Sequence, residues 1–223
     1  MTDMRWQPDA PPFRSHVVVA APHPDDEVLG CAGMMAWLVE AGHDVRIVAV
    51  TDGAASHAES SRIEPAELVA CRALERARAL ARLGLADVRT NRLGFPDAGV
   101  RDHEDELAGA LVPELDRETT LVVPWRHDGH PDHEAVARAG RRAAADAGAS
   151  CCEVPIWARV RGRRCRPRHR LELGAFRGQK CAAVGEFRSQ LVALGPDPVD
   201  GPVVHAAELR ALTSGSEWVV SVT

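Results

Sequence analysis

Short apolar runs alternate with longer amphipathic segments along most of the chain, and this alternation restricts the fold more than any other feature. Runs with the length and composition of buried strands cover residues 16–21, 44–50, 88–93, 120–125 and 152–158. Between them, segments with helical patterns cover residues 25–41, 65–83, 104–116 and 131–147. Strands that alternate with helices of ten or more residues form parallel βαβ units. We therefore predict a three-layer α/β fold with a mainly parallel sheet, extended by C-terminal additions.

The composition is that of an ordinary globular protein. The 223 residues are 45% hydrophobic and 26% charged, and this length suits one core, so we expect residues 1–223 to form a single domain. The net charge of −5 and the lack of a long apolar run argue against a nucleic acid or a membrane as partner. The first fourteen residues lack the apolar centre of a secretory signal, so we expect a cytoplasmic protein. The sequence is also compatible with a homo-oligomer.

A His-Pro-Asp turn occurs twice, at residues 23–25 and 130–132. Each turn follows an apolar strand and opens a helix. One such turn alone is commonly a helix cap, but two at equivalent strand ends are harder to explain in that way. In an open parallel sheet, ligands bind beyond the carboxyl ends of strands, where the strand order reverses. With the strand order 3-2-1-4-5, the first and fourth strands flank that point, and the two turns face each other across one crevice.

The residue types in and beside these turns suit a metal ion. His23, Asp26 and His133 supply two imidazoles and one carboxylate, a donor set typical of catalytic zinc that also accepts Fe²⁺. His130 lies three residues before His133, so both rings are expected to face the crevice. Of the neighbouring carboxylates Asp25 and Asp26, one can bind the metal while the other serves as general base.

The two turns with their neighbours resemble the paired motifs of the PIG-L/LmbE-like metal-dependent N-deacetylases. The first motif is Ala-Pro-His-Pro-Asp-Asp-Glu at residues 21–27, and the second is His-Pro-Asp-His at residues 130–133. Supporting matches occur in the same order at residues 51–53, 72–75 and 125–129. Members of this family remove acetyl groups from N-acetylglucosaminyl conjugates and similar amino sugars, usually with zinc. The resemblance extends over most of the chain.

This resemblance implies a Rossmann-like sheet and a role for each residue of the motifs. The implied metal ligands are His23, Asp26 and His133, with Asp25 as base and His130 as the group that stabilises the oxyanion. We further expect the Asp132 carboxylate to orient His130 and keep it charged, because an anionic partner favours the protonated imidazole.

Three residues outside the motifs are candidates for substrate binding, namely Arg72, Asp52 and Gly53. Each also has a simpler interpretation. Arg72 is one helical turn from Glu75 and can form an intrahelical ion pair. Asp52 and Gly53 follow the second strand and can form an ordinary turn.

The sequence therefore predicts a zinc-dependent hydrolase, with Fe²⁺ as the alternative metal. It would remove an acyl group, expected to be acetyl, from the amide nitrogen of a small-molecule amino sugar or related conjugate. A non-haem iron oxygenase would use His23, Asp25 and a distant histidine, but such triads usually lie on barrels of many short strands. A non-catalytic binding module would use the seven arginines of residues 159–170, but that run has no aromatic residues and the chain is acidic.

Overall fold

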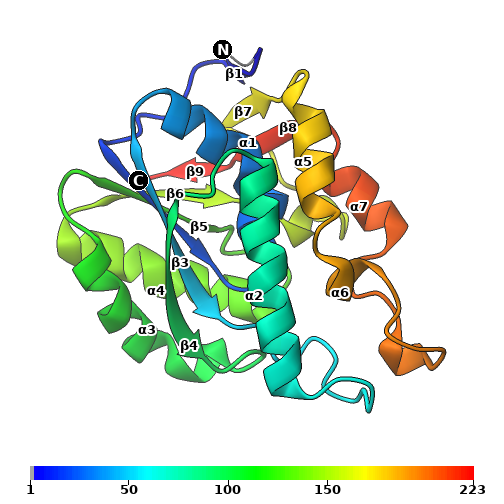
Figure 1. Cartoon of the computed structure of the whole chain (residues 1–223). Helices are drawn as coiled ribbons and strands as arrows, with labels where there is room; N and C mark the ends of the chain where they lie inside the picture. Colours follow the sequence, from blue (N-terminus) through cyan, green and yellow to red (C-terminus); the bar gives the residue numbers. More distant parts are fainter. Residues whose placement is uncertain (1–2) are drawn as a thin grey trace.

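The computed structural model describes residues 3–223 and has a six-stranded sheet at its centre (Figure 1). The strand order is β4-β3-β2-β5-β6-β9, in which the first five strands are parallel and β9 is antiparallel to β6. Counted along the chain, the parallel strands have the predicted order 3-2-1-4-5. The strands are β2 (His16–Ala21), β3 (Asp44–Thr51), β4 (Arg89–Phe95), β5 (Thr119–Pro124), β6 (Ser150–Val154) and β9 (Ser221–Val222).

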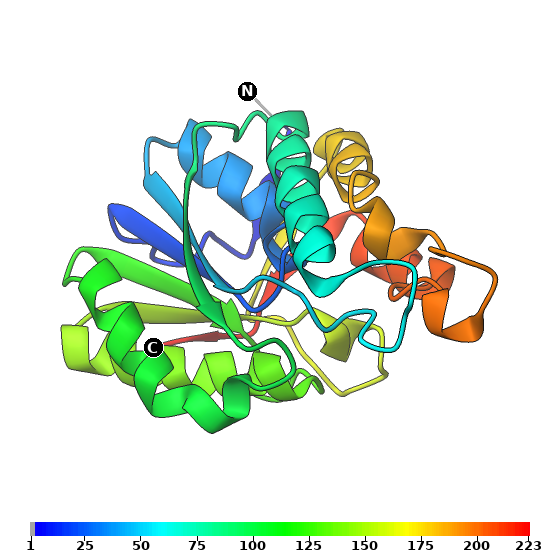
Figure 2. The ribbon, with the colours of Figure 1, turned by 60° about the horizontal axis from the view of Figure 1, so that its bottom comes forward.

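Helices cover both faces of this sheet, which gives the three predicted layers (Figure 2). Alternate residues of β2 point to opposite faces, so Val17 packs in one buried apolar cluster and Val18 in the other. Two helices contribute to the Val17 cluster, α1 (Asp26–Glu40) and α2 (Pro65–Arg82). Two others contribute to the Val18 cluster, α3 (Glu104–Leu111) and α4 (Pro131–Ala147).

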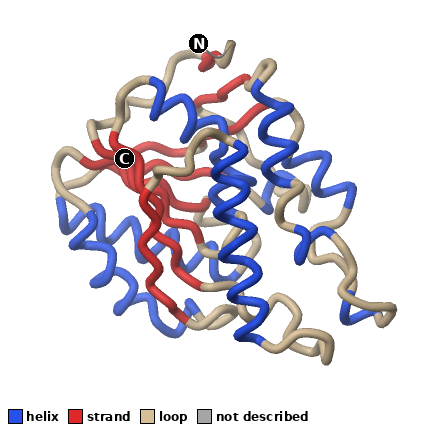
Figure 3. Tube along the Cα trace, viewed as in Figure 1, coloured by secondary structure: helices blue, strands red, loops and turns tan. Residues whose placement is uncertain are grey.

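A second, antiparallel sheet joins the two ends of the chain, and the sequence did not predict it (Figure 3). Its strands are β1 (Arg5–Gln7), β7 (His169–Glu172) and β8 (Ser216–Val219), in the order β1-β7-β8. The other C-terminal elements are α5 (Phe176–Val184), α6 (Arg188–Leu191) and α7 (Ala206–Leu212). Four short 3₁₀ turns complete the order: η1 (Val100–His103), η2 (Val112–Glu114), η3 (Trp157–Arg159) and η4 (Pro198–Asp200).

A buried ion pair connects the second sheet to helix α1. The Lys180 ammonium lies 2.8 Å from Glu217 Oε1 and donates to the Leu29 carbonyl at 2.8 Å. The Glu217 carboxylate accepts the backbone N–H groups of Gly33 and Met34. A buried charge is stable only when it is paired and hydrogen-bonded. The contacts of Lys180 and Glu217 therefore hold the second sheet in contact with α1.

Two predicted elements end earlier than the sequence pattern indicated. The fifth strand, expected over residues 152–158, is β6 and ends at Val154. The next residues turn away and donate backbone N–H groups to the buried Asp128 carboxylate. The helix expected over residues 104–116 is α3, which ends at Leu111 and is followed by the 3₁₀ turn η2. The α-helix ends there because Pro113 has no N–H to continue the helical hydrogen bonds. In the described part of the chain, no helix has the length and apolar character needed to cross a membrane.

Candidate metal centre and active site

The two His-Pro-Asp turns meet at the carboxyl ends of β2 and β5, which are parallel neighbours in the central sheet. The first turn leads into α1 and the second into α4. The ring centroids of His23 and His133 are 5.4 Å apart, and those of His130 and His133 are 4.8 Å apart. Side chains more than a hundred residues apart in sequence are thus brought into one cluster, as the strand order predicted.

Three of these side chains present donor atoms to a common point. Asp26 Oδ2 lies 3.0 Å from His23 Nδ1 and 3.1 Å from His133 Nε2. One donor atom from each residue lies within 4.8 Å of the others, close enough to hold one metal ion. His133 Nε2 is buried, and no described residue forms a well-oriented hydrogen bond with it. A buried nitrogen without a well-oriented hydrogen bond favours a further partner, and a metal ion would supply one.

On each of the two imidazole rings, the nitrogen that does not contact Asp26 contacts another carboxylate. Asp128 Oδ2 lies 2.8 Å from His133 Nδ1, and the oxygens of Asp97 and Asp132 each lie 3.2 Å from His23 Nε2. A ring nitrogen that donates to a carboxylate leaves the lone pair on the other nitrogen for a metal. With a metal bound, the lone pairs of His23 Nδ1 and His133 Nε2 would therefore be available on the side of Asp26.

These carboxylates make the cluster attract positive charge. Burial alone would lower the pKa of His133, but Asp26 and Asp128 outweigh it and raise that pKa to about 9. Burial likewise opposes a charged His23, whereas Asp132 and Asp26 raise its pKa well above the usual value. A metal cation that binds here displaces these protons.

Asp128 also fixes the loop that carries the second turn. Its fully buried carboxylate accepts backbone N–H groups of Ile156, Trp157 and Ala158 at 2.8 to 3.0 Å. Arg161 donates a hydrogen bond to the carbonyl of Gly129, which belongs to the same loop. The arginine-rich segment of residues 159–170 thus contributes to holding the candidate metal site in place.

Asp132 does not make the contact that the sequence predicted. Its carboxylate accepts the N–H groups of Ala98 and Val100 and contacts His23 Nε2, and it forms no hydrogen bond with the His130 ring. His130 Nδ1 instead accepts the backbone N–H of Asp132 at 3.3 Å, so the ring proton resides on Nε2. Burial is the main cause that lowers the pKa of His130 to about 4, and the neighbouring His133 and His23 act in the same direction. The expected charged His130 is corrected to a neutral N–H donor.

The neighbouring carboxyl groups Asp25 and Asp26 differ in their electrostatics. Burial raises the pKa of Asp25 to about 7, against the opposing charge of Arg72. Burial would also raise the pKa of Asp26, but His133 and His23 hold it well below the usual value. Asp25 therefore exchanges protons near neutrality, while Asp26 stays ionised. Asp25 has φ 148°, a strained conformation of the kind that concentrates at functional sites.

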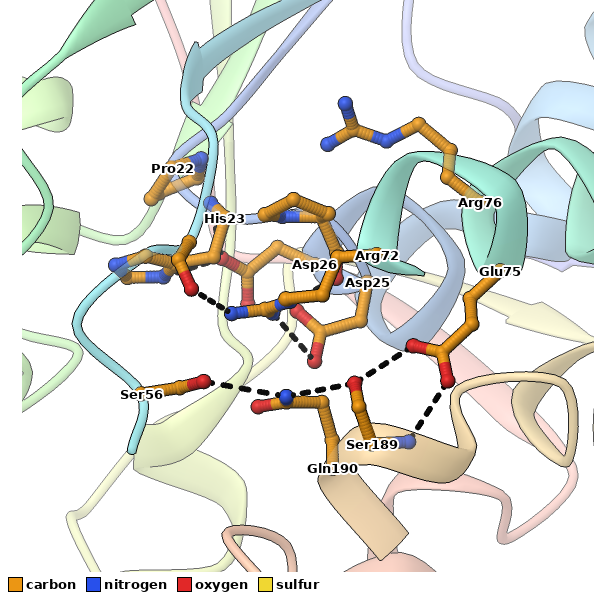
Figure 4. A network of polar contacts seen from close by, with 12 residues as sticks. Pro22, His23, Asp25, Asp26, Ser56, Arg72, Glu75, Arg76, Ser189 and Gln190 are labelled. Atoms are coloured by element: carbon orange, nitrogen blue, oxygen red, sulfur yellow. Dashed lines mark hydrogen bonds and ion pairs between the residues drawn. The ribbon is translucent and has the colours of Figure 1, made fainter. Parts of the chain in front are cut away.

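Arg72 reaches the candidate site, but Asp52 and Gly53 do not take the expected positions. The Arg72 guanidinium lies 3.3 Å from Asp25 (Figure 4). It also donates to the Pro24 and Gly53 carbonyls. Gly53 has φ +70°, and a Cβ there would lie 2.2 Å from Arg72 Nη1. Gly53 thus lies directly against the Arg72 guanidinium. Asp52 forms an ion pair with Arg92. Neither lines the cavity described next, so direct substrate contact by Asp52 and Gly53 is not supported.

A cavity of about 250 Å³ opens in front of these groups. Its lining includes the polar groups of His23, Asp25, Arg72 and His130. Trp157, Gln190, Val203 and Val204, from later parts of the chain, also line it. The volume lies just below the ~300–1,000 Å³ of typical small-molecule pockets, so the cavity suits one small ring or acylated amine.

Comparison with known proteins gives similarities in both sequence and structure. Residues 18–144 match a family model described as PIG-L, GlcNAc-PI de-N-acetylase. The 2'-N-acetylparomamine deacetylase of Streptomyces fradiae is 33% identical over 153 residues, which cover 60% of this chain and 54% of that protein. The chain spans about half the length of the curated relatives it matches.

Two solved structures show the same fold. A conserved protein of Thermus thermophilus, TT1542, is 29% identical, with a TM-score of 0.65 over 94% of each chain. An N,N'-diacetylchitobiose deacetylase of Pyrococcus horikoshii has a TM-score of 0.67 at 19% identity, over 94% of this chain and 83% of that one.

Proposed function

Because the chain belongs to the PIG-L family, we propose that it is a metal-dependent N-deacetylase acting on an amino sugar or a related small conjugate. The observation that carries this proposal is the meeting of a His-Asp-His donor set with the neighbouring Asp25 carboxyl group beside one cavity, which His23, Asp25 and Asp26 line. The family match favours this function over the oxygenase and the binding module. We also propose that residues 1–223 act as one domain, supported by a core cluster that includes Val17 and Val219 of the two sheets.

The donor set fits zinc. His23 Nδ1, Asp26 Oδ2 and His133 Nε2 would hold the ion, and the carboxylates behind both rings match the outer partners that zinc-bound histidines usually have. When bound, the metal would polarise the amide carbonyl and acidify a water molecule. The same donors accept Fe²⁺, so the identity of the metal is part of the proposal.

The remaining steps fall to the residues of the chain. Asp25 takes the proton of the attacking water and passes it to the departing amine, and a pKa near 7 suits both transfers. Arg72 holds the Asp25 carboxylate in place. His130 donates from Nε2 to the oxyanion that develops on the carbonyl, and loss of such a donor typically costs about 2.7–4 kcal/mol.

Acetate release tests the proposal directly. Purified protein would be incubated with N-acetylglucosamine, its conjugates and N-acetylated aminoglycoside sugars, and its metal content measured on the same sample. We expect acetate and free amine in equal amounts, activity lost with a chelator and restored by zinc. Metal-loaded protein that deacetylates none of these compounds would contradict the proposed function.

Arg72→Gln should move the acidic limb of the pH profile of kcat/KM to higher pH. The positive charge of Arg72 lowers the pKa of Asp25, so its removal raises that pKa and keeps the base protonated up to a higher pH. Arg78→Gln, an exposed position on the same helix, is the matched control and should leave the limb in place. The position of the limb does not depend on how much of the variant is folded. An unmoved limb would show that Arg72 does not act on the base.

A further inference from the structure

A chain of hydrogen bonds links Glu75, Ser189, Gln190 and Ser56, of which Ser56 and Gln190 line the cavity (Figure 4). Glu75 on α2 accepts both the backbone N–H and the hydroxyl of Ser189 on α6, each at 2.7 Å. Gln190 Nε2 donates to Ser189 Oγ at 3.0 Å and to Ser56 Oγ at 3.3 Å. These contacts fix the Gln190 side chain between two elements that are distant in sequence.

The chemistry of this chain determines which way the Gln190 amide faces. A carboxylate only accepts hydrogen bonds, so the Ser189 hydroxyl must give its proton to Glu75. The Ser189 oxygen then has only lone pairs to offer, and the group that contacts it must be a donor. The Gln190 NH₂ therefore faces the two serines, and its carbonyl oxygen Oε1 faces away from them.

Gln190 Oε1 has no donor among residues 3–223. The residue is 1% exposed and lines the cavity, and its two amide hydrogens are already used. This oxygen is not among the fully enclosed side-chain atoms that lack a partner, so it touches the open space of the cavity as a free hydrogen-bond acceptor. A ligand in the cavity can supply the missing donor from a hydroxyl or an N–H group.

The backbone of Gln190 also positions two apolar residues that line the cavity. Its carbonyl accepts the N–H groups of Val203 and Val204 at 2.9 and 3.0 Å, and both valines line the cavity. Gln190, Val203 and Val204 lie outside residues 18–144, the part that matches the family model and that contains the histidines and carboxylates of the candidate metal site.

We propose that Gln190 is a specificity-determining residue whose amide oxygen accepts a hydrogen bond from a hydroxyl group on the ring of an N-acetylated amino sugar. Val203 and Val204 would pack against the less polar face of that ring. The inference rests on the proposed function and deepens it, because it selects ring-hydroxylated substrates over simple N-acetylated amines.

The test compares N-acetylglucosamine with its 3-, 4- and 6-deoxy analogues as probes, by acetate release from zinc-loaded protein. The enzymes are the wild type, Gln190→Leu and the matched control Gln179→Leu, an exposed position on α5. We expect the wild type and the control to prefer the parent sugar over one analogue by about 10- to 100-fold in kcat/KM, the effect of one unpaired buried carbonyl. In Gln190→Leu this preference should fall to about one, because only the reaction of the parent sugar becomes slower.

The preference is a ratio measured within one preparation, so incomplete folding of a variant does not change it. An unchanged ratio in Gln190→Leu, with turnover present, overturns the inference and leaves the proposed function standing. Equal rates of the wild type with all four probes also overturn the inference alone. If the wild type releases acetate neither from these probes nor from any other N-acetylated amino sugar, both the inference and the proposed function are overturned.

Discussion

Asp25→Asn is expected to lower kcat by 10²-fold or more while metal content and KM stay close to their wild-type values. Asparagine keeps the shape of aspartate, so the backbone at this position, with φ 148°, should persist. It cannot accept a proton, and loss of a general base typically costs 10²- to 10⁴-fold. Kinetics and metal analysis on the same preparation check the result.

Asp26→Asn is the matched comparison for this prediction. Asp26 lies between His23 and His133 and stays ionised, so its replacement should remove metal rather than only basicity. If Asp25→Asn loses metal and Asp26→Asn keeps it, the two roles are reversed. If both variants keep metal and turnover, the mechanism proposed here is wrong.

His133→Ala is expected to abolish both metal binding and turnover. The side chain is fully buried, and its Nε2 is the donor that has no other well-oriented partner in the described residues. His127→Ala is the matched control, because His127 is an exposed histidine of the same loop and should keep metal and activity. Metal stoichiometry, with thermal unfolding to confirm folding, checks the outcome. Full occupancy in His133→Ala would remove it from the ligand set.

Asp128→Asn gives an intermediate case for the same measurement. Its carboxylate contacts His133 Nδ1, whereas the proposed metal-binding atom of that ring is Nε2. The expected effect is therefore a metal affinity about 10- to 100-fold weaker, with stoichiometry recovered at high zinc. Loss as complete as in His133→Ala would place Asp128 among the ligands.

The central sheet could be predicted because its signals are local. The run at residues 16–21 coincides with β2, and the pattern at residues 131–147 coincides with α4, since apolar spacing within one segment is enough to identify each. The second sheet gives no such signal. Arg5–Gln7 and His169–Glu172 are too short to show a period, and the two strands pair although they lie more than 160 residues apart.

The candidate site was predictable only where a motif and the strand order placed a residue. His23, Asp26 and His133 come together because parallel neighbouring strands end at one edge of the sheet. The direction of a side chain within a turn depends instead on which groups other segments bring to it. Asp132 faces His23 rather than His130 because the Ala98 and Val100 amides, from the loop after β4, hold its carboxylate there.

Asp97, Asp128 and Gln190 gain their roles in the same way, from segments that meet only in the folded chain. Asp97 and Asp128 lie near strand ends, which marks them as candidates but does not give their partners. Gln190 lies in a segment with little pattern, and only its contacts with Ser189 and Ser56 reveal the free oxygen.

The buried pair between Lys180 and Glu217 has a practical consequence for chemical labelling. Lys180 is the only lysine of the chain, and its side chain is completely inaccessible. In the folded state, amine-acylating reagents therefore find no lysine side chain to modify. Acylation of Lys180 requires the contact with Glu217 and α1 to open, so its rate measures how often this part of the core unfolds. Acylation of Lys180, read by mass spectrometry, thus reports the opening of this part of the core.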